Sequence, residues 1–180
     1  MKQPRKLDAE GLWNYAVRLL SGRAHSTGEI TLKLRARAER LEDVDGVLAR
    51  LRDLGYLNDR QFAESYASTR LETHRLGRVR VLRDLRARRI APAVADQTVN
   101  HVYRDVDERE LIDDYLRRKL RIEERPGLFQ DDKALASAFR RLMRAGFSRS
   151  NAVAVLKKHA ASAEALDAMQ GSEEETTEEM

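Results

Sequence analysis

Apolar residues recur at helical spacing along almost the whole chain, and this periodicity limits the fold more than any other feature. The first stripe follows the i, i+3, i+4, i+7, i+8 pattern and consists of Leu12, Tyr15, Ala16, Leu19 and Leu20. Such a stripe is typical of an amphipathic helix with one buried face. Only 9 glycines and 3 prolines interrupt the 180 residues, which argues against a protein built from tightly turned strands. We therefore expect an all-α fold.

The same spacing, combined with helix start and stop signals, predicts nine helices. Asp8 is the expected N-cap of the first, and Ser26-Thr27-Gly28-Glu29 has the form of a capping box that opens the second. Gly55 is expected just past the end of the third helix, and Asp59 is expected to cap the fourth. Pro92 suits the first turn of the sixth, where its missing N–H has no partner to lose.

The nine predicted helices fall into three similar groups. Leu34, Leu85 and Leu142 occupy equivalent positions, because the residues four before and fourteen after each of them are apolar and basic residues follow closely. Pro126-Gly127 breaks the chain and lengthens the third group. The expected three-helix repeats are 8–57, 58–105 and 106–160. Units of this size bury little surface alone, so we expect them to stack into an elongated, curved body.

The net charge of +4 combines two parts of opposite sign. Residues 162–180 contain seven acidic residues and no Lys or Arg, so residues 1–161 carry a charge of +11. We expect 161–180 to be a disordered acidic tail. A basic body with such a tail favours a polyanionic partner or a protein with an acidic groove, and solubility alone is the alternative.

The densest basic segment runs from Arg75 to Arg89. It holds seven arginines and one acid, Asp84, which gives +6 within 15 residues. Arginine suits planar recognition of phosphate or carboxylate groups, and Arg78, Arg86 and Arg89 are expected on one helix face. Contact with a nucleic-acid backbone, contact with an acidic protein groove, and a solvated helix face all stay open as interpretations. The candidate electrostatic contacts are Arg23, Lys33, Arg35, Arg37, Arg75, Arg78, Arg80, Arg83, Arg86, Arg88 and Arg89.

Patterns that carry catalysis or bind metals are missing from the sequence. It has neither a Gly-rich phosphate loop nor an H-E-x-x-H motif, and it has no cysteine. Adjacent acids such as Asp113-Asp114 do not face each other on a helix, and the four histidines lie far apart. We therefore expect a protein that is not an enzyme and uses no cofactor or metal. The aromatic residues at core spacing are Tyr56, Phe62, Tyr66, Tyr103 and Tyr115.

Membrane and export signals are also missing. No apolar run approaches the ~18 residues that span a bilayer. The stretch from Met1 to Leu7 is charged and lacks the apolar centre of a signal peptide. The expected location is the cytoplasm, with no membrane partner.

Two stretches resemble the RecX family of regulatory proteins. Arg23-Ala24-His25-Ser26, with Glu29-Ile30 and Lys33-Leu34 after it, resembles the family's R-x-x-S-x-x-E-L-x-x-K-L stretch. The second stretch resembles G-Y-[IL]-[DN]-D-x-x-F-A-x-x-Y, and the residues that carry the two matches are Ser26, Glu29, Gly55, Tyr56, Asp59, Phe62 and Tyr66. The chain departs from the family where Arg89-Ile90 replaces Gly-Ile and where Asn58 stands in place of the commoner Asp.

The resemblance implies three tandem three-helix modules and a modulator of the RecA recombinase. Members of this family bind the RecA filament on single-stranded DNA and limit filament growth, ATP hydrolysis, strand exchange and co-protease activity. The implied setting is homologous recombination, DNA repair and the SOS response, and we expect a monomer. Double-stranded DNA is a further candidate partner. A stand-alone helix-turn-helix-like DNA-binding protein and a nucleic-acid enzyme are the two alternative functions.

Deletion of residues 162–180 tests the role of the acidic tail. If the tail competes with DNA for the basic body, its removal tightens DNA binding at low salt, because seven negative charges are lost. Fluorescence anisotropy of a labelled single strand at low and at high salt measures the effect. An unchanged affinity at low salt would leave the tail a solubilising terminus.

Overall fold

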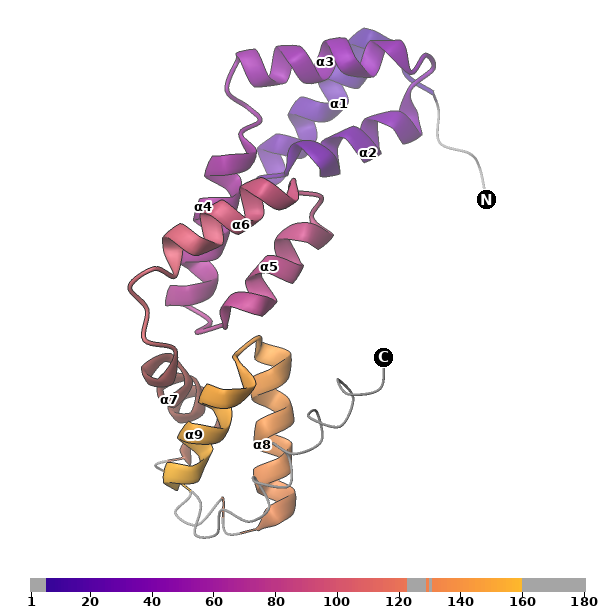
Figure 1. Ribbon diagram of the computed structural model, residues 1–180. Helices are drawn as coiled ribbons and strands as arrows, with labels where there is room; N and C mark the ends of the chain where they lie inside the picture. The colour runs from indigo at the N-terminus through magenta and orange to yellow at the C-terminus, as the bar shows by residue number, and fades with distance from the viewer. Residues whose placement is uncertain (1–5, 123–128, 130, 160–180) are drawn as a thin grey trace, which may run out of the picture. The chain divides into compact units, whose positions relative to one another are not determined.

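The computed structural model describes residues 6–122, 129 and 131–159, and Figure 1 shows their helices. Within these residues the regular structure is helical, which confirms the all-α prediction. The helices are α1 (Ala9–Gly22), α2 (Thr27–Arg37), α3 (Glu42–Asp53), α4 (Asp59–Glu72), α5 (Arg78–Ala87), α6 (Pro92–Val102), α7 (Glu108–Leu120), α8 (Asp132–Ala145) and α9 (Arg149–His159). The predicted break at Pro126-Gly127 and the predicted tail 161–180 lie outside the described residues.

The helix starts follow the predicted capping chemistry, with one exception. The Asp8 carboxylate accepts a hydrogen bond from the Gly11 amide at 2.8 Å, and Ser26 and Glu29 form the predicted capping box of α2. The prediction that Asp59 caps α4 is wrong. The side chain of Asn58 accepts the bond from the Gln61 amide at 3.0 Å, so Asn58 is the cap.

Several helices end on a residue in the left-handed region, and the sequence analysis predicts this only for Gly55. After α3, Gly55 has φ +74, and the Tyr56 amide donates to the Leu51 carbonyl at 2.9 Å, which is a Schellman ending. After α5, Arg89 has φ +63, and the Ile90 amide donates to the Leu85 carbonyl in the same way. Arg89 therefore lies beyond α5, and the prediction that it shares a helix face with Arg78 and Arg86 is wrong.

The chain divides into two compact units that do not coincide with single repeats. The first unit consists of Met1–Ser68 and Leu82–Val102, and the second of Thr69–Val81 and Tyr103–Met180. Helices α4 and α5 each contribute residues to both units. The repeat boundaries 8–57, 58–105 and 106–160 stay a prediction.

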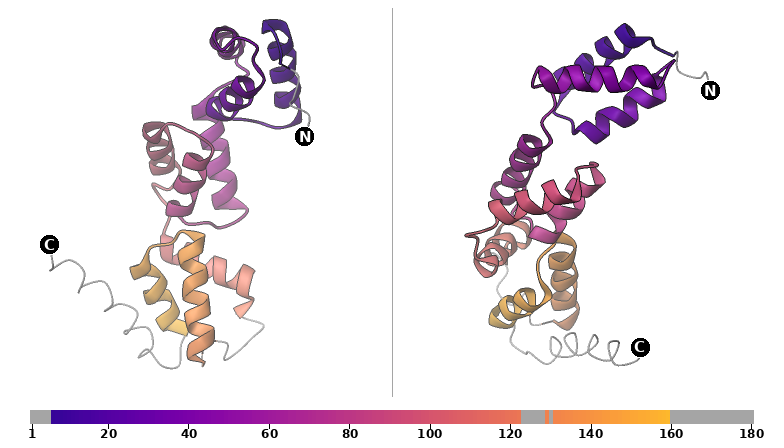
Figure 2. Two further views of the ribbon diagram at one scale, coloured as in Figure 1. Left: turned by 90° about the vertical axis from the view of Figure 1, so that its right-hand side faces the viewer. Right: turned by 45° about the horizontal axis from the view of Figure 1, so that its top comes forward.

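In the first unit, α1, α2 and α3 pack pairwise around an aliphatic core, and the grouping is visible from two further directions in Figure 2. Fully buried leucines and isoleucines fill its centre, among them Leu12, Ile30 and Leu34. A short parallel bridge closes one end, where the Leu7 amide donates to the Arg37 carbonyl at 2.8 Å and the Glu39 amide donates to the Leu7 carbonyl. The first unit thus has its own core.

Tyr56 does not join this core, which corrects the sequence-based prediction for that residue. The turn at Gly55 leaves Tyr56 54% exposed and sends Leu57 into the core instead, where Leu57 is 5% exposed. The tyrosine ring meets Trp13 edge-on, with ring centroids 6.4 Å apart.

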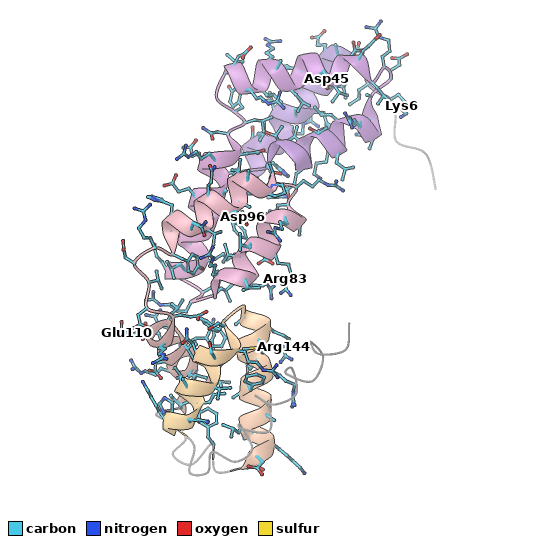
Figure 3. The ribbon with its side chains drawn as sticks, viewed as in Figure 1. Lys6, Asp45, Arg83, Asp96, Glu110 and Arg144 are labelled. Carbon is cyan, nitrogen blue, oxygen red and sulfur yellow. The ribbon has the colours of Figure 1, made fainter. Side chains whose placement is uncertain are left out.

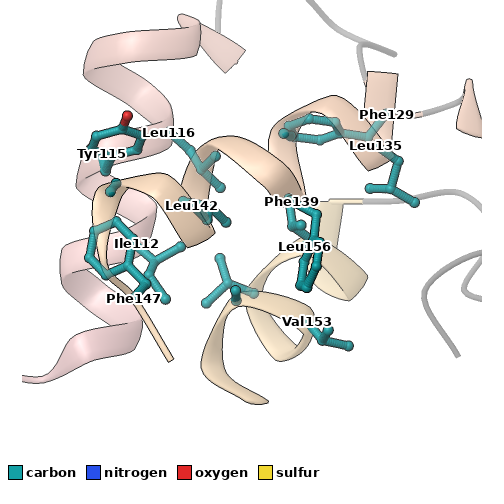
Figure 4. Packing of buried hydrophobic residues seen from close by; sticks show 14 of the residues in the cluster. Ile112, Tyr115, Leu116, Phe129, Leu135, Phe139, Leu142, Phe147, Val153 and Leu156 are labelled. Atoms are coloured by element: carbon teal, nitrogen blue, oxygen red, sulfur yellow. The ribbon is translucent and has the colours of Figure 1, made fainter. Parts of the chain in front are cut away.

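The second unit has a richer core, shown in Figure 4, in which α9 packs against both α7 and α8. Ile112, Leu116, Leu142 and Leu156 are completely buried there, and Tyr115, as predicted, is a core residue. The amides of Gly77 and Val79 donate to the carbonyls at the end of α8, which joins the start of α5 to this core. None of the helices in the described part of the chain is long and apolar enough to cross a membrane.

Two glycine substitutions are expected to change stability in opposite directions. A Cβ on Gly77 lies 2.2 Å from the Gly146 carbonyl oxygen, so Gly77→Ala forces backbone apart and lowers the free energy of unfolding by about 1–3 kcal/mol. Gly46 lies inside α3 with open space around its Cβ position, so Gly46→Ala raises stability by about 1 kcal/mol. Urea denaturation measures both. A tolerated Gly77→Ala would contradict the close backbone approach.

Candidate functional site

The candidate contacts are basic residues on α2, on α5 and in the segments beside these helices, and the structure divides them by the exposure of their side chains. Exposure and bonding do not exclude each other, because Arg23 and Arg86 are exposed and also pair with acids. The exposed members of the predicted set are Arg23, Arg35, Arg78, Arg83, Arg86 and Arg89. Lys33, Arg37, Arg75, Arg80 and Arg88 are half-buried.

Arg88, one of the half-buried residues, contacts side chains of two other helices. Its guanidinium donates to the Glu29 carboxylate at 3.2 Å and lies over the ring of Tyr66, 4.9 Å from the centroid. Tyr66 in turn stacks on Phe62, with centroids 6.2 Å apart, and its hydroxyl donates to Asp84 at 3.3 Å. Arg88 thereby connects the end of α5 to α2 and α4 within the first unit.

The Glu29 carboxylate contacts three side chains, those of Arg23, His25 and Arg88. Both carboxylate oxygens accept from Arg23 at 3.4 Å, and the His25 ring nitrogen Nδ1 lies 3.2 Å from Oε2. Burial alone raises the pKa of Glu29, but the hydrogen bonds from Arg23 and Ser26 and the charges of Arg23 and Arg88 outweigh burial and hold that pKa below its usual value. Glu29 is therefore a charged group satisfied inside the fold.

His25 sits beside this carboxylate with its side chain 4% exposed. Burial lowers the pKa of His25, and the Arg23 charge lowers it further, although Glu29 acts in the opposite direction. The imidazole is thus neutral near pH 7, which agrees with its buried place in the network.

The remaining motif residues hold the same joint together through backbone contacts. The Ser26 hydroxyl donates to the Arg88 carbonyl at 2.5 Å, and the Asp59 carboxylate accepts from the Thr27 amide at 2.7 Å. A Cβ on Gly28 lies 2.4 Å from the Cβ of Arg89, so the end of α5 meets the start of α2 at a position without a side chain. The two sequence motifs therefore meet in one place, and they build a joint between α2, α4 and α5.

Arg37 and Arg75 also contact other parts of their own units. The Arg37 guanidinium lies 5.0 Å from the centroid of the Tyr15 ring in the first unit. In the second unit, Arg75 lies 3.7 Å from the Asp114 carboxylate.

In the first unit, four exposed arginines of the predicted set lie on α2, on α5 or just past the end of α5. Arg86 pairs with Asp96 at 3.2 Å, but both side chains are about half exposed, so solvent screens this pair. Figure 3 marks Arg83 and Asp96 on their helices. Arg35 near the end of α2, Arg83 and Arg89 are exposed as well. These side chains give the unit a positively charged surface.

The second unit has a basic group that the sequence-based site set did not include. The Arg80 guanidinium donates to the Arg144 carbonyl at 3.2 Å, which holds the start of α5 against the end of α8. Arg144 (Figure 3), Arg140 and Arg141 are exposed on α8, on the side opposite its buried leucines. The signal for them was in the sequence, because basic residues lie close to the equivalent leucine in all three groups, slightly shifted in the third.

The described ranges offer no cluster of metal-binding side chains. There, no three His, Asp or Glu side chains gather in a way that could hold a metal ion. Asp113 and Asp114 point to different partners, His159 and Arg75, so they do not act as one carboxylate pair.

Two models of a protein family match this chain. Residues 13–51 match the model described as RecX, first three-helix domain, and residues 58–99 match RecX, second three-helix domain. These matches cover most of α1–α3 and of α4–α6.

Similar proteins bear the same family name. A "Regulatory protein RecX" of Deinococcus radiodurans is 32% identical over 81% of this chain and 67% of its own length. Another, of Streptomyces coelicolor, is 30% identical over 79% of this chain and 73% of its own. The crystal structure of RecX from Lactobacillus salivarius superposes with a TM-score of 0.68 at 21% identity, covering 83% of this chain and 95% of the other, which supports the fold.

Glu29→Gln tests whether the joint stabilises the fold through charge. The Glu29 side chain is 18% exposed, and losing its charged hydrogen bonds is expected to cost about 2 kcal/mol near pH 7. Because the folded-state pKa is lowered, this contribution is present above the unfolded-state pKa and is lost as the pH falls through the folded-state value.

Urea denaturation at about pH 7 and about pH 3 measures the difference between the wild type and Glu29→Gln. Glu64→Gln is the matched control, because Glu64 is an exposed carboxylate on α4 and its loss is expected to change stability by less than about 0.5 kcal/mol. A cost for Glu29→Gln that stays the same at both pH values would argue against the charge-based role.

Proposed function

The chain belongs to the RecX family of regulatory proteins, and from this premise we propose that it binds the RecA filament on single-stranded DNA and restrains it. Family membership is the observation that carries the proposal. Filament growth, ATP hydrolysis, strand exchange and co-protease activity are the RecA functions that it limits. It acts in the cytoplasm as a monomer, during homologous recombination, DNA repair and the SOS response.

The charge distribution supports contact with a polyanion. Arg35, Arg83, Arg86 and Arg89 are exposed in the first unit, and solvent screens the pair of Arg86 with Asp96. Phosphate groups are bidentate acceptors that match the guanidinium fork, and neutralising them releases counterions. The DNA backbone of the filament is therefore the proposed target of these side chains.

The same distribution narrows the predicted contact set. Arg23 and Arg88 bond to Glu29, Arg37 lies on Tyr15, and Arg80 bonds to Arg144, so their guanidinium groups already stabilise the fold. We assign direct contact to the exposed residues instead. In the second unit, that role falls to Arg140, Arg141 and Arg144.

We propose that the protein limits filament growth by occupying part of the filament surface. A helical protein that covers part of the filament blocks addition of the next RecA subunit without any bond being made or broken. This mechanism requires only that the protein binds the filament tightly and at the site where the next RecA subunit would bind. Its strength therefore depends on how many contacts form at once.

The triple variant Arg35→Glu, Arg83→Glu, Arg86→Glu tests the placement in the first unit. We expect its affinity for RecA filaments on single-stranded DNA to fall about ten- to hundredfold, at roughly 0.5–1 kcal/mol for each exposed charge contact. Inhibition of RecA-driven ATP hydrolysis is expected to weaken in parallel. Co-sedimentation and an ATP hydrolysis assay measure the two effects, and circular dichroism verifies the fold.

Arg18→Glu with Arg60→Glu is the matched control, because both side chains are exposed on other helices of the same unit. We expect it to bind nearly as well as the wild type. Full inhibition by the triple variant would refute the placement. A wild-type protein that binds duplex DNA in a footprint but leaves RecA activity unchanged would favour the stand-alone DNA-binding alternative.

A further inference from the structure

A shallow groove of about 440 Å³ lies between α1 and α3 in the first unit. Tyr56, a residue of the second motif, lies beside the groove through its contact with Trp13. The side chains and backbone that define it include Glu10, Trp13, Glu42, Asp43, Gly46 and Arg50.

One side of the groove has the composition of a protein-binding surface. The Arg50 guanidinium lies over the Trp13 ring, 4.0 Å from its centroid, and Trp13 meets exposed Tyr56 edge-on. Leu54, two residues before Tyr56, is 56% exposed. Trp, Tyr and Arg are the residues that most often dominate protein–protein binding energy, and here they lie together at the surface.

The other side of the groove is acidic. Glu10 and Glu42 are exposed, and Arg40 pairs with Asp43 at 2.8 Å and with Glu42 at 3.5 Å. Because Arg40 and Glu42 are both largely exposed, solvent screens their pair and leaves the Glu42 carboxylate accessible. Asp45, marked on α3 in Figure 3, adds a further exposed carboxylate next to Gly46. These charges repel phosphate and attract a basic side chain, so the groove favours protein over nucleic acid.

Gly46 leaves the groove accessible. A Cβ at this position would meet no atom within 4 Å, although Gly46 lies inside α3, where glycine costs about 1 kcal/mol relative to alanine. The missing side chain opens space between Trp13 and the acidic side.

We propose that this groove binds a segment of the RecA protein that carries a lysine or arginine next to an apolar side chain. The basic group faces Glu10 and Glu42, and the apolar group packs on Trp13 and Tyr56. This inference rests on the proposed function. It assigns two roles within the first unit: the exposed arginines contact DNA, and the α1–α3 groove contacts protein.

Gly46→Gln tests the groove by filling it, because the longer side chain enters open space and glutamine is a better helix former than glycine. We expect at least a tenfold loss of affinity for RecA filaments on single-stranded DNA and no change in affinity for the single strand alone. Gly22→Gln is the matched control, since Gly22 ends α1 and also has nothing within 4 Å of its Cβ position. It should bind like the wild type.

A direct readout comes from Trp13, the single tryptophan of the chain. In protein labelled with 5-fluorotryptophan, DNA-free RecA is expected to shift the fluorine resonance, and single-stranded DNA alone is not. Wild-type affinity in Gly46→Gln, or equal losses in Gly46→Gln and Gly22→Gln, would overturn the groove while leaving the proposed function intact. Failure of the wild type to bind the filament would overturn both.

Discussion

The carboxylate of Glu29 is the interaction on which the first unit depends. It caps its own helix through the Ser26 amide, and it also binds guanidinium groups from the segment after α1 and from the end of α5. A half-buried carboxylate with this many donors is stable in the folded protein. Removing one donor leaves part of the charge uncompensated and lowers the stability of the fold. Residues 59 positions apart in the chain are thereby held at a fixed separation.

This joint explains why a motif can be specific without being a contact surface. Ser26, Glu29 and Asp59 satisfy backbone or arginine donors, and Phe62 and Tyr66 provide a flat face for Arg88. Loss of one of these acceptors would leave a buried or half-buried donor without its partner, which destabilises the fold. The residues that carry the family resemblance are therefore residues that hold the helices of the first unit together.

Local chemistry made most of the fold predictable. Helix periodicity, the Asp8 cap and the Gly55 turn depend on residues within one turn of each other, so the sequence alone contains them. The exchange of roles between Asn58 and Asp59 was not visible, because Asp59 is drawn to the Thr27 amide, 32 positions away. Exposure of Tyr56 likewise depends on Leu57 taking the place in the core.

The positive charge of the candidate surface could be predicted from the sequence, but which arginines are exposed on it could not. Arginine density indicated where positive charge concentrates, but the division between exposed and bonded side chains follows from partners distant in sequence. Arg88 and Arg83 look alike in the sequence, yet one lies on an aromatic ring and the other is exposed. Only three-dimensional packing distinguishes them.

Among the described residues, those other than glycine with positive φ are all arginines: Arg75, Arg89 and Arg121. Each occupies a helix-ending position where glycine is the easier residue. Every arginine codon is a single base change from a glycine codon. At Arg89, whose side chain is exposed, a single nucleotide change to glycine therefore removes a surface charge and relieves the backbone, while α5 keeps its end.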